Sequence, residues 1–276
     1  MKKMNRLFVC YKPLYISSNK FLHNIKKKYG VKKAGFSGTL DPFACGTLIV
    51  AFGQYTKLFN YLQKTPKKYK ATLWLGARSE TLDLEQIQSI TTIPPFSKKK
   101  IKDILDNLKG KISYIPPKYS AKKINGQKAY NLAKNNQQIN LTPVTTTIYN
   151  IKLLNYSHPF LSFEIEVSEG GYIRSIAQII AKRLGTDGSL SFLERVNEGK
   201  FVYQNEKALD VRNFLKIKKN FYLQKKSDIL LGKKLKIQNF QIQDDGEYYL
   251  EIDDFLTIIE IKDKKVKYKI NGVKVC

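Results

Sequence analysis

The chain has 276 residues, which is enough for one large domain or for a large domain with a small one. Its hydrophobic content of 42% excludes wholesale disorder, and no run approaches the roughly 20 apolar residues that a membrane helix needs. The 49 Lys and Arg residues outnumber the 23 Asp and Glu residues, which gives a net charge of +26. An excess of this size predicts a polyanionic partner such as nucleic acid, although a general preference for surface lysine is the simpler alternative.

Several classes of site are excluded by what the chain lacks. The apolar stretch Leu7–Tyr11 is too short for a signal peptide, so we expect a cytoplasmic protein. The cysteines are far apart and only two histidines occur, which argues against a disulfide framework, a metal site and a histidine-based triad. Phosphate-binding and dinucleotide-binding glycine motifs are absent as well, so the sequence predicts no metal and no cofactor.

The first half of the chain alternates short strand and helix patterns. Ser17 is a suitable N-cap for a helix that Gly30 ends, and a glycine-rich stretch follows over residues 35–46. The predicted strands are Leu7–Tyr11, Leu48–Phe52 and Tyr69–Leu75, and Thr56–Leu62 is predicted to be a short helix.

The second half adds two helices, a polar segment and several strands. Ser97 caps a predicted helix that Gly110 ends, and a Lys-rich segment interleaved with tyrosines follows at about 117–143. Leu161–Val167 alternates cleanly between apolar and polar residues, as a strand with one solvated face does, and a helix is predicted over Tyr172–Leu184. Short strands are predicted at 248–252, 256–261 and 266–270.

This order of elements predicts an α+β fold, because steady strand–helix–strand alternation is missing. A basic stretch at 216–226 is a plausible linker, so we expect a main domain over residues 1–225 and a small one over 226–276. About 50 residues cannot bury a large core, so the small domain is expected to pack on the main body.

Asp41 is the first candidate for chemistry. Pro42 disfavours the helical conformation at position 41, and Gly35, Gly38 and Gly46 let the surrounding loop bend or pack closely. A carboxylate held on such a loop beside apolar residues can act as a nucleophile or a general base. An ordinary aspartate in a Gly/Pro turn is the alternative.

Three other side chains are candidates for the same site. Arg174, at the start of a predicted helix, can pair with a carboxylate such as Asp41 and keep it ionised, unless it is simply a surface arginine. Tyr69 and Tyr172 can each present a ring to a base, although half-buried tyrosines are common. The Lys- and Tyr-rich segment 117–142 is either an arm that lies on RNA or a solvated loop.

Several motifs, taken together and in order, resemble the TruB-type tRNA pseudouridine synthases. Gly35–Gly46, which reads GFSGTLDPFACG, is similar to the catalytic motif of that family. The other matching segments are Lys12-Pro13, Lys67–Lys70, Gly76–Asp83, Pro116–Lys123, Gly170–Ser175 and Leu193–Arg195. The resemblance covers residues 7–203, and the tail resembles the family's small PUA-like domain only loosely.

The resemblance implies a fold and a reaction. The fold is a mixed, mostly antiparallel sheet flanked by helices, with an RNA-clamping insertion at about 117–143. The reaction detaches a T-arm uracil of tRNA, at position 55 in the tRNA convention, and reattaches it through carbon, without a cofactor. A monomer acting on a flipped-out base is implied.

The resemblance also assigns roles to six residues. Asp41 is implied as the nucleophile, attacking either the uracil ring or the sugar, and Arg174 as its partner. Tyr69 is implied to stack on the base, and Leu193 to form the pocket wall. Tyr172 is implied either to accept the proton at uracil C5 or to lie against that atom.

The sixth residue, Phe36, stands where the family usually has His, and it is implied to help flip the base. Cys45, Glu194 and Val144 are further departures from the family pattern. A non-catalytic RNA-binding protein on the same scaffold, and a related synthase acting on ribosomal RNA, are the alternatives.

Overall fold

The computed structural model describes residues 4–120, 123–124, 127–128, 130, 132 and 141–275. Most of the predicted RNA-clamping insertion at 117–143 therefore lies outside the described residues. In the described part of the chain, no helix is both long enough and apolar enough to cross a membrane.

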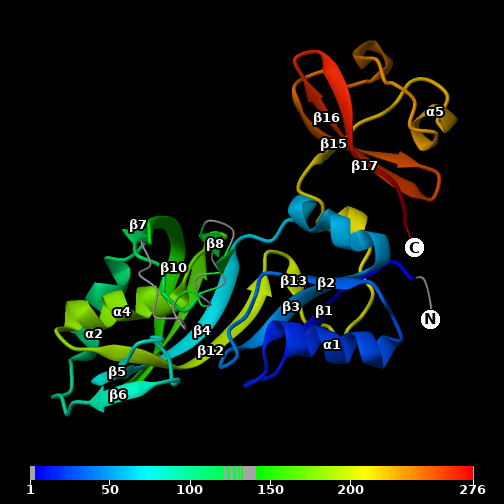
Figure 1. The fold of residues 1–276 in the computed structure, drawn as a ribbon. Helices are drawn as coiled ribbons and strands as arrows, with labels where there is room; N and C mark the ends of the chain where they lie inside the picture. The colour runs from blue at the N-terminus through cyan, green and yellow to red at the C-terminus, as the bar shows by residue number, and fades with distance from the viewer. Residues whose placement is uncertain are drawn as a thin grey trace.

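A single large sheet forms the body of the molecule (Figure 1). Its nine strands are β1 (Arg6–Lys12), β2 (Ala34–Ser37), β3 (Cys45–Phe52), β4 (Lys67–Leu75), β7 (Gly110–Tyr114), β10 (Val144–Ser157), β11 (Phe160–Val167), β12 (Gly188–Glu198) and β13 (Phe201–Val202). The order is β1-β3-β12-β4-β11-β10-β7, with β2 beside β3 and β13 beside β12. Every pair is antiparallel except β3 with β12. The predicted mixed, mostly antiparallel sheet is confirmed.

Helices cover the sheet at both ends. They are α1 (Ser18–Tyr29), α2 (Lys98–Asp106) and α4 (Ile173–Leu184), with a 3-10 segment η1 (Gly53–Tyr61). Figure 1 shows α2 and α4 together at one end and α1 at the other. The apolar side of α4, including Ile176 and Ile180, is buried in the core that β4, β10 and β11 share. At its amino end, α4 begins directly after Tyr172, so it brings Arg174 to the middle of the sheet face.

Two short hairpins project from this body. They are β5 (Ala77–Ser79) with β6 (Ile87–Ile90), and β8 (Lys123–Ile124) with β9 (Gln127–Lys128). Between β5 and β6, Asp83 forms an isolated parallel bridge with Leu190 of β12. The β5–β6 hairpin is therefore fixed against the large sheet.

The C-terminal part forms a second, four-stranded sheet. Its strands are β14 (Lys218–Lys219), β15 (Gly246–Ile252), β16 (Phe255–Lys262) and β17 (Lys265–Lys274), and they pair in that order. The short helices of this part and of the connection to it are η2 (Val211–Phe214), α5 (Ser227–Leu230) and η3 (Ile237–Asn239).

The second sheet packs on the main body, as its small size predicts. Leu58 and Leu62 of the main body share a buried cluster with Leu256 and Val273 of the second sheet. Because β14 precedes residue 226, this sheet draws on residues from both sides of the predicted 225/226 boundary.

Candidate active site

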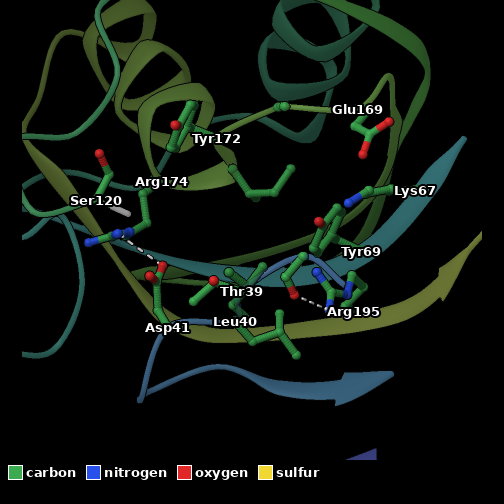
Figure 2. A pocket seen from close by; sticks show the side chains of 15 residues that line it. Thr39, Leu40, Asp41, Lys67, Tyr69, Ser120, Glu169, Tyr172, Arg174 and Arg195 are labelled. Atoms are coloured by element: carbon green, nitrogen blue, oxygen red, sulfur yellow. Dashed lines mark hydrogen bonds and ion pairs between the residues drawn. The ribbon is translucent and has the colours of Figure 1, made fainter. Parts of the chain in front are cut away.

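Five of the six predicted site residues line one cavity of about 330 Å³ on the face of the large sheet. They are Asp41, Tyr69, Tyr172, Arg174 and Leu193. Figure 2 shows Asp41 and Arg174 on one side of this cavity, and Tyr69 on the other. Segments far apart in the sequence therefore meet at a single site.

Asp41 lies in the segment Gly38–Ala44 between β2 and β3, which we call the aspartate loop. Ser18 at the start of α1 holds this loop, because its Oγ accepts a hydrogen bond from the Leu40 N–H (3.0 Å) and donates one to the Leu40 carbonyl (2.9 Å). The Ala44 N–H donates to the Asp41 carbonyl (3.1 Å). Buried side chains, including that of Phe43, anchor the loop in the core.

A buried lysine also holds the aspartate loop. Lys12 is fully buried, and its Nζ donates to the carbonyls of Pro13 (2.9 Å), Ile16 (2.8 Å) and Pro42 (3.4 Å). Burial lowers the pKa of Lys12 to about 8, because the charged ammonium is removed from water. Lys12 therefore connects the end of β1 to the residue that follows Asp41.

Arg174 fixes the orientation of Asp41. Its Nη2 lies 2.9 Å from Asp41 Oδ2, and its Nη1 lies 3.0 Å from Asp83 Oδ2. It also donates to the carbonyls of Thr81 (2.7 Å) and Tyr119 (2.8 Å). The side chain of Arg174 is only 5% exposed, whereas that of Asp41 is 34% exposed. The guanidinium is thus immobilised by groups outside the cavity and presents the Asp41 carboxylate to it (Figure 2).

Asp83 is a member of this network that the sequence analysis did not assign a role. Its carboxylate is buried and accepts hydrogen bonds from the Thr81 hydroxyl and the Glu85 N–H (3.0 Å). Burial raises the pKa of Asp83 above its ordinary value. Its position within the glycine- and threonine-containing segment 76–83 is the one sequence signal that could have identified it.

The remaining residues form the walls of the cavity. Tyr69 on β4 lies opposite Arg195 of β12, and Leu193 lies opposite Ala71, so the tyrosine and the leucine face the cavity from neighbouring strands. Tyr172 precedes α4, and its N–H donates to Tyr114 Oη (2.8 Å). Burial raises the pKa of the Tyr172 phenol, which is therefore neutral at pH 7.

Phe36 lies elsewhere. It belongs to β2, pairs with Val50 of β3, and packs against the cluster of buried residues that contains Phe8 and Ile25. It is not among the residues that line the cavity. Its role in base flipping stays a prediction.

The match to a family model covers much of this site. The model for the TruB family pseudouridylate synthase (N terminal domain) matches residues 26–173, which is more than half of the chain. The chain belongs to the TruB family. The matched segment includes Asp41, Tyr69 and Tyr172, and it ends one residue before Arg174.

Whole-length relatives support the membership of the TruB family. A tRNA pseudouridine synthase B from a Nitratiruptor species is 56% identical over 270 residues, which cover 98% of this chain and 98% of the relative. The protein of the same name from Campylobacter jejuni is 50% identical over 273 residues, covering 99% of this chain and all of the relative.

Solved structures share the fold at low sequence identity. A chain from the crystal structure of a Cbf5–Nop10–Gar1 complex is 19% identical with a TM-score of 0.68, covering 99% of this chain and 85% of that chain. A chain from an H/ACA RNP bound to a substrate RNA containing 2′-deoxyuridine is 20% identical with a TM-score of 0.63, covering 98% of this chain and 84% of that one. These similarities confirm the pseudouridine synthase fold.

Proposed function

We propose that this pseudouridine synthase isomerises the T-arm uridine of tRNA, position 55 in the tRNA convention, with Asp41 as the nucleophile. The observation that carries the proposal is the Asp41–Arg174 ion pair of 2.9 Å inside a cavity that two tyrosines also line. A partly exposed carboxylate can act as a nucleophile, a fixed guanidinium orients it, and aromatic rings can hold a base that has left the RNA stack.

The choice of RNA rests on charge and on relatives. A net charge of +26 favours binding to a phosphate backbone. Relatives that match this chain over nearly its whole length carry the name tRNA pseudouridine synthase B. All five cavity residues named above come from one chain, so we propose that a monomer carries out the reaction. Because the proposed substrate is tRNA, we also propose that the protein acts in the cytoplasm.

The reaction exchanges one bond for another. Asp41 attacks either C1′ of the ribose or C6 of the uracil ring, and the bond between N1 and C1′ breaks. The detached uracil turns within the cavity and a bond forms between C5 and C1′. The bond between Asp41 and the substrate then breaks, C5 loses its proton and N1 gains one. The two routes differ in the first atom attacked.

The other side chains serve the bound base. Tyr69 stacks on the uracil after it leaves the RNA stack, and contacts of this kind are worth roughly 1–3 kcal/mol per base. Leu193 packs against the ring, and Tyr172 takes the proton from C5. Because burial raises the pKa of Tyr172, its phenol is protonated at rest, so its own proton must first leave to N1 of the detached uracil, which carries a proton in the product, before the oxygen accepts the proton from C5.

A minimal T-arm stem–loop tests the function. Incubation with the purified chain, followed by nucleoside mass spectrometry, is expected to show one pseudouridine, and none in a stem–loop whose target uridine is replaced by cytidine. Stoichiometric binding without conversion would favour a non-catalytic RNA-binding protein. Conversion of ribosomal RNA fragments but not of the T arm would favour a different substrate.

A further inference from the structure

A second cluster of charges lies at the edge of the cavity, opposite Arg174. Glu198 of β12 pairs with Lys67 of β4 (Oε2 to Nζ, 2.9 Å) and with Arg195 of β12 (Oε1 to Nη2, 2.9 Å). The side chain of Glu198 is 0% exposed. In the described part of the chain neither oxygen of this carboxylate has a hydrogen-bond partner, so the two ion pairs alone compensate its charge.

An irregularity in β12 creates this cluster. In a regular strand, residues three apart point to opposite faces of the sheet. The pairing of β12 with β4 shifts register between Arg195 and Asn197, which adds one residue to β12 and turns Glu198 to the face that Arg195 occupies. Lys67 lies directly opposite Glu198 on β4. A bulge next to an active site commonly re-aims a side chain in this way.

The cluster contacts the aspartate loop through Arg195. This guanidinium donates from Nη2 to the Gly38 carbonyl (2.9 Å) and from Nε to the Thr47 carbonyl (2.9 Å). Gly38 has a φ of +69° and fits so closely that an added Cβ would lie 3.1 Å from both Lys67 Nζ and Glu198 Oε2. Figure 2 shows Arg195 and Lys67 on the side of the cavity away from Asp41.

We propose that Arg195 is a positioning residue that holds the start of the aspartate loop, and that Glu198 makes this possible by neutralising the repulsion between Arg195 and Lys67. Two buried positive charges that flank one carboxylate repel each other strongly once that carboxylate is neutralised. The activity test of this role rests on the proposed function, whereas the hydrogen-exchange test of the aspartate loop does not.

The test uses Glu198→Gln, which keeps the shape of the side chain and removes its charge. We expect the single-turnover rate on the T-arm stem–loop to fall at least about tenfold, because small displacements of a reacting group are costly. Affinity for the RNA is expected to stay within about twofold, since Glu198 is buried. In the free protein, hydrogen exchange of the Leu40 and Ala44 amides is expected to accelerate at least tenfold.

A double variant separates electrostatic positioning from packing. Glu198→Gln combined with Lys67→Met returns the net charge of the cluster to its original +1, and we expect it to recover at least a third of the wild-type rate and of the loop protection. The double variant also decides the proposal if Glu198→Gln alone fails to fold. As a matched control, Glu206→Gln removes a carboxylate that pairs with Lys28 far from the cavity, and it should change neither readout.

Wild-type rate and wild-type loop exchange in Glu198→Gln would overturn the proposal, as would a double variant no better than the single one. If the wild-type chain forms no pseudouridine in the T arm, the substrate assignment fails, and hydrogen exchange alone decides the role of the cluster.

Discussion

The two sides of the aspartate loop carry charge clusters of opposite composition. On one side, the guanidinium of Arg174 lies between two carboxylates, those of Asp41 and Asp83. On the other side, the carboxylate of Glu198 lies between two cations, Lys67 and Arg195. Asp41 is 34% exposed and Glu198 is 0% exposed, so the first cluster presents a carboxylate to the cavity, whereas the second encloses its carboxylate completely. Exposure, rather than residue type, therefore separates the proposed nucleophile from the proposed supporting carboxylate.

The largest effect is expected from Arg174→Lys. Lysine keeps the charge but lacks the planar fork that holds Asp41 and Asp83 at once, so we expect the single-turnover rate to fall about 10²-fold or more. RNA affinity, measured by filter binding, should change little because Arg174 is buried. Near-normal turnover would show that this cluster does not position Asp41.

Tyr172→Phe is expected to slow pseudouridine formation about 10²-fold, because the ring stays but the oxygen that we propose takes the C5 proton is lost. Burial raises the pKa of Tyr172, so its phenol stays protonated from pH 6 to pH 9. The pH–rate profile of the variant should therefore be lower than that of the wild type but parallel to it. An unchanged rate would remove Tyr172 from the chemistry.

Asp83→Asn tests the second carboxylate that pairs with Arg174. We expect a loss of about tenfold, smaller than for Arg174→Lys, because the carbonyls of Thr81 and Tyr119 still hold the guanidinium. Since the pKa of Asp83 is raised, lowering the pH neutralises it earlier than an ordinary aspartate. The acid decline of the wild-type rate should therefore begin at a higher pH than that of Asp83→Asn, and identical profiles would contradict this role.

The smallest effect is expected from Tyr69→Phe, which keeps the stacking ring between the two clusters. Its single-turnover rate should stay within about threefold of the wild type. Tyr69→Leu, which loses the ring, should be about 5- to 150-fold slower, as the usual stacking energy predicts. If both variants behave alike, the ring does not stack on the base.

Much of the fold follows from local sequence patterns. The strands around Tyr69 and Phe163 alternate clearly, and the glycine at position 185 marks the end of α4, so periodicity and capping predict these elements. β10 and β12 were missed because register shifts interrupt both strands, and an extra residue destroys the alternation on which the prediction depends.

The site was predictable only in part. The pairing of Arg174 with Asp41, expected from chemistry and resemblance, is present in the structure. The contacts of Asp83 and Glu198 depend on a hairpin that folds back and on a strand bulge, and no local spacing reveals either. Long-range pairing of polar residues therefore marks the limit of what the sequence shows.

Asp41→Asn is the decisive substitution, because the proposed reaction starts with attack by the Asp41 carboxylate. In a single-turnover assay on the T-arm stem–loop, with binding measured in parallel, we expect no detectable pseudouridine and an RNA affinity within a few-fold of the wild type. Conversion at the wild-type rate by Asp41→Asn would show that Asp41 is not the nucleophile.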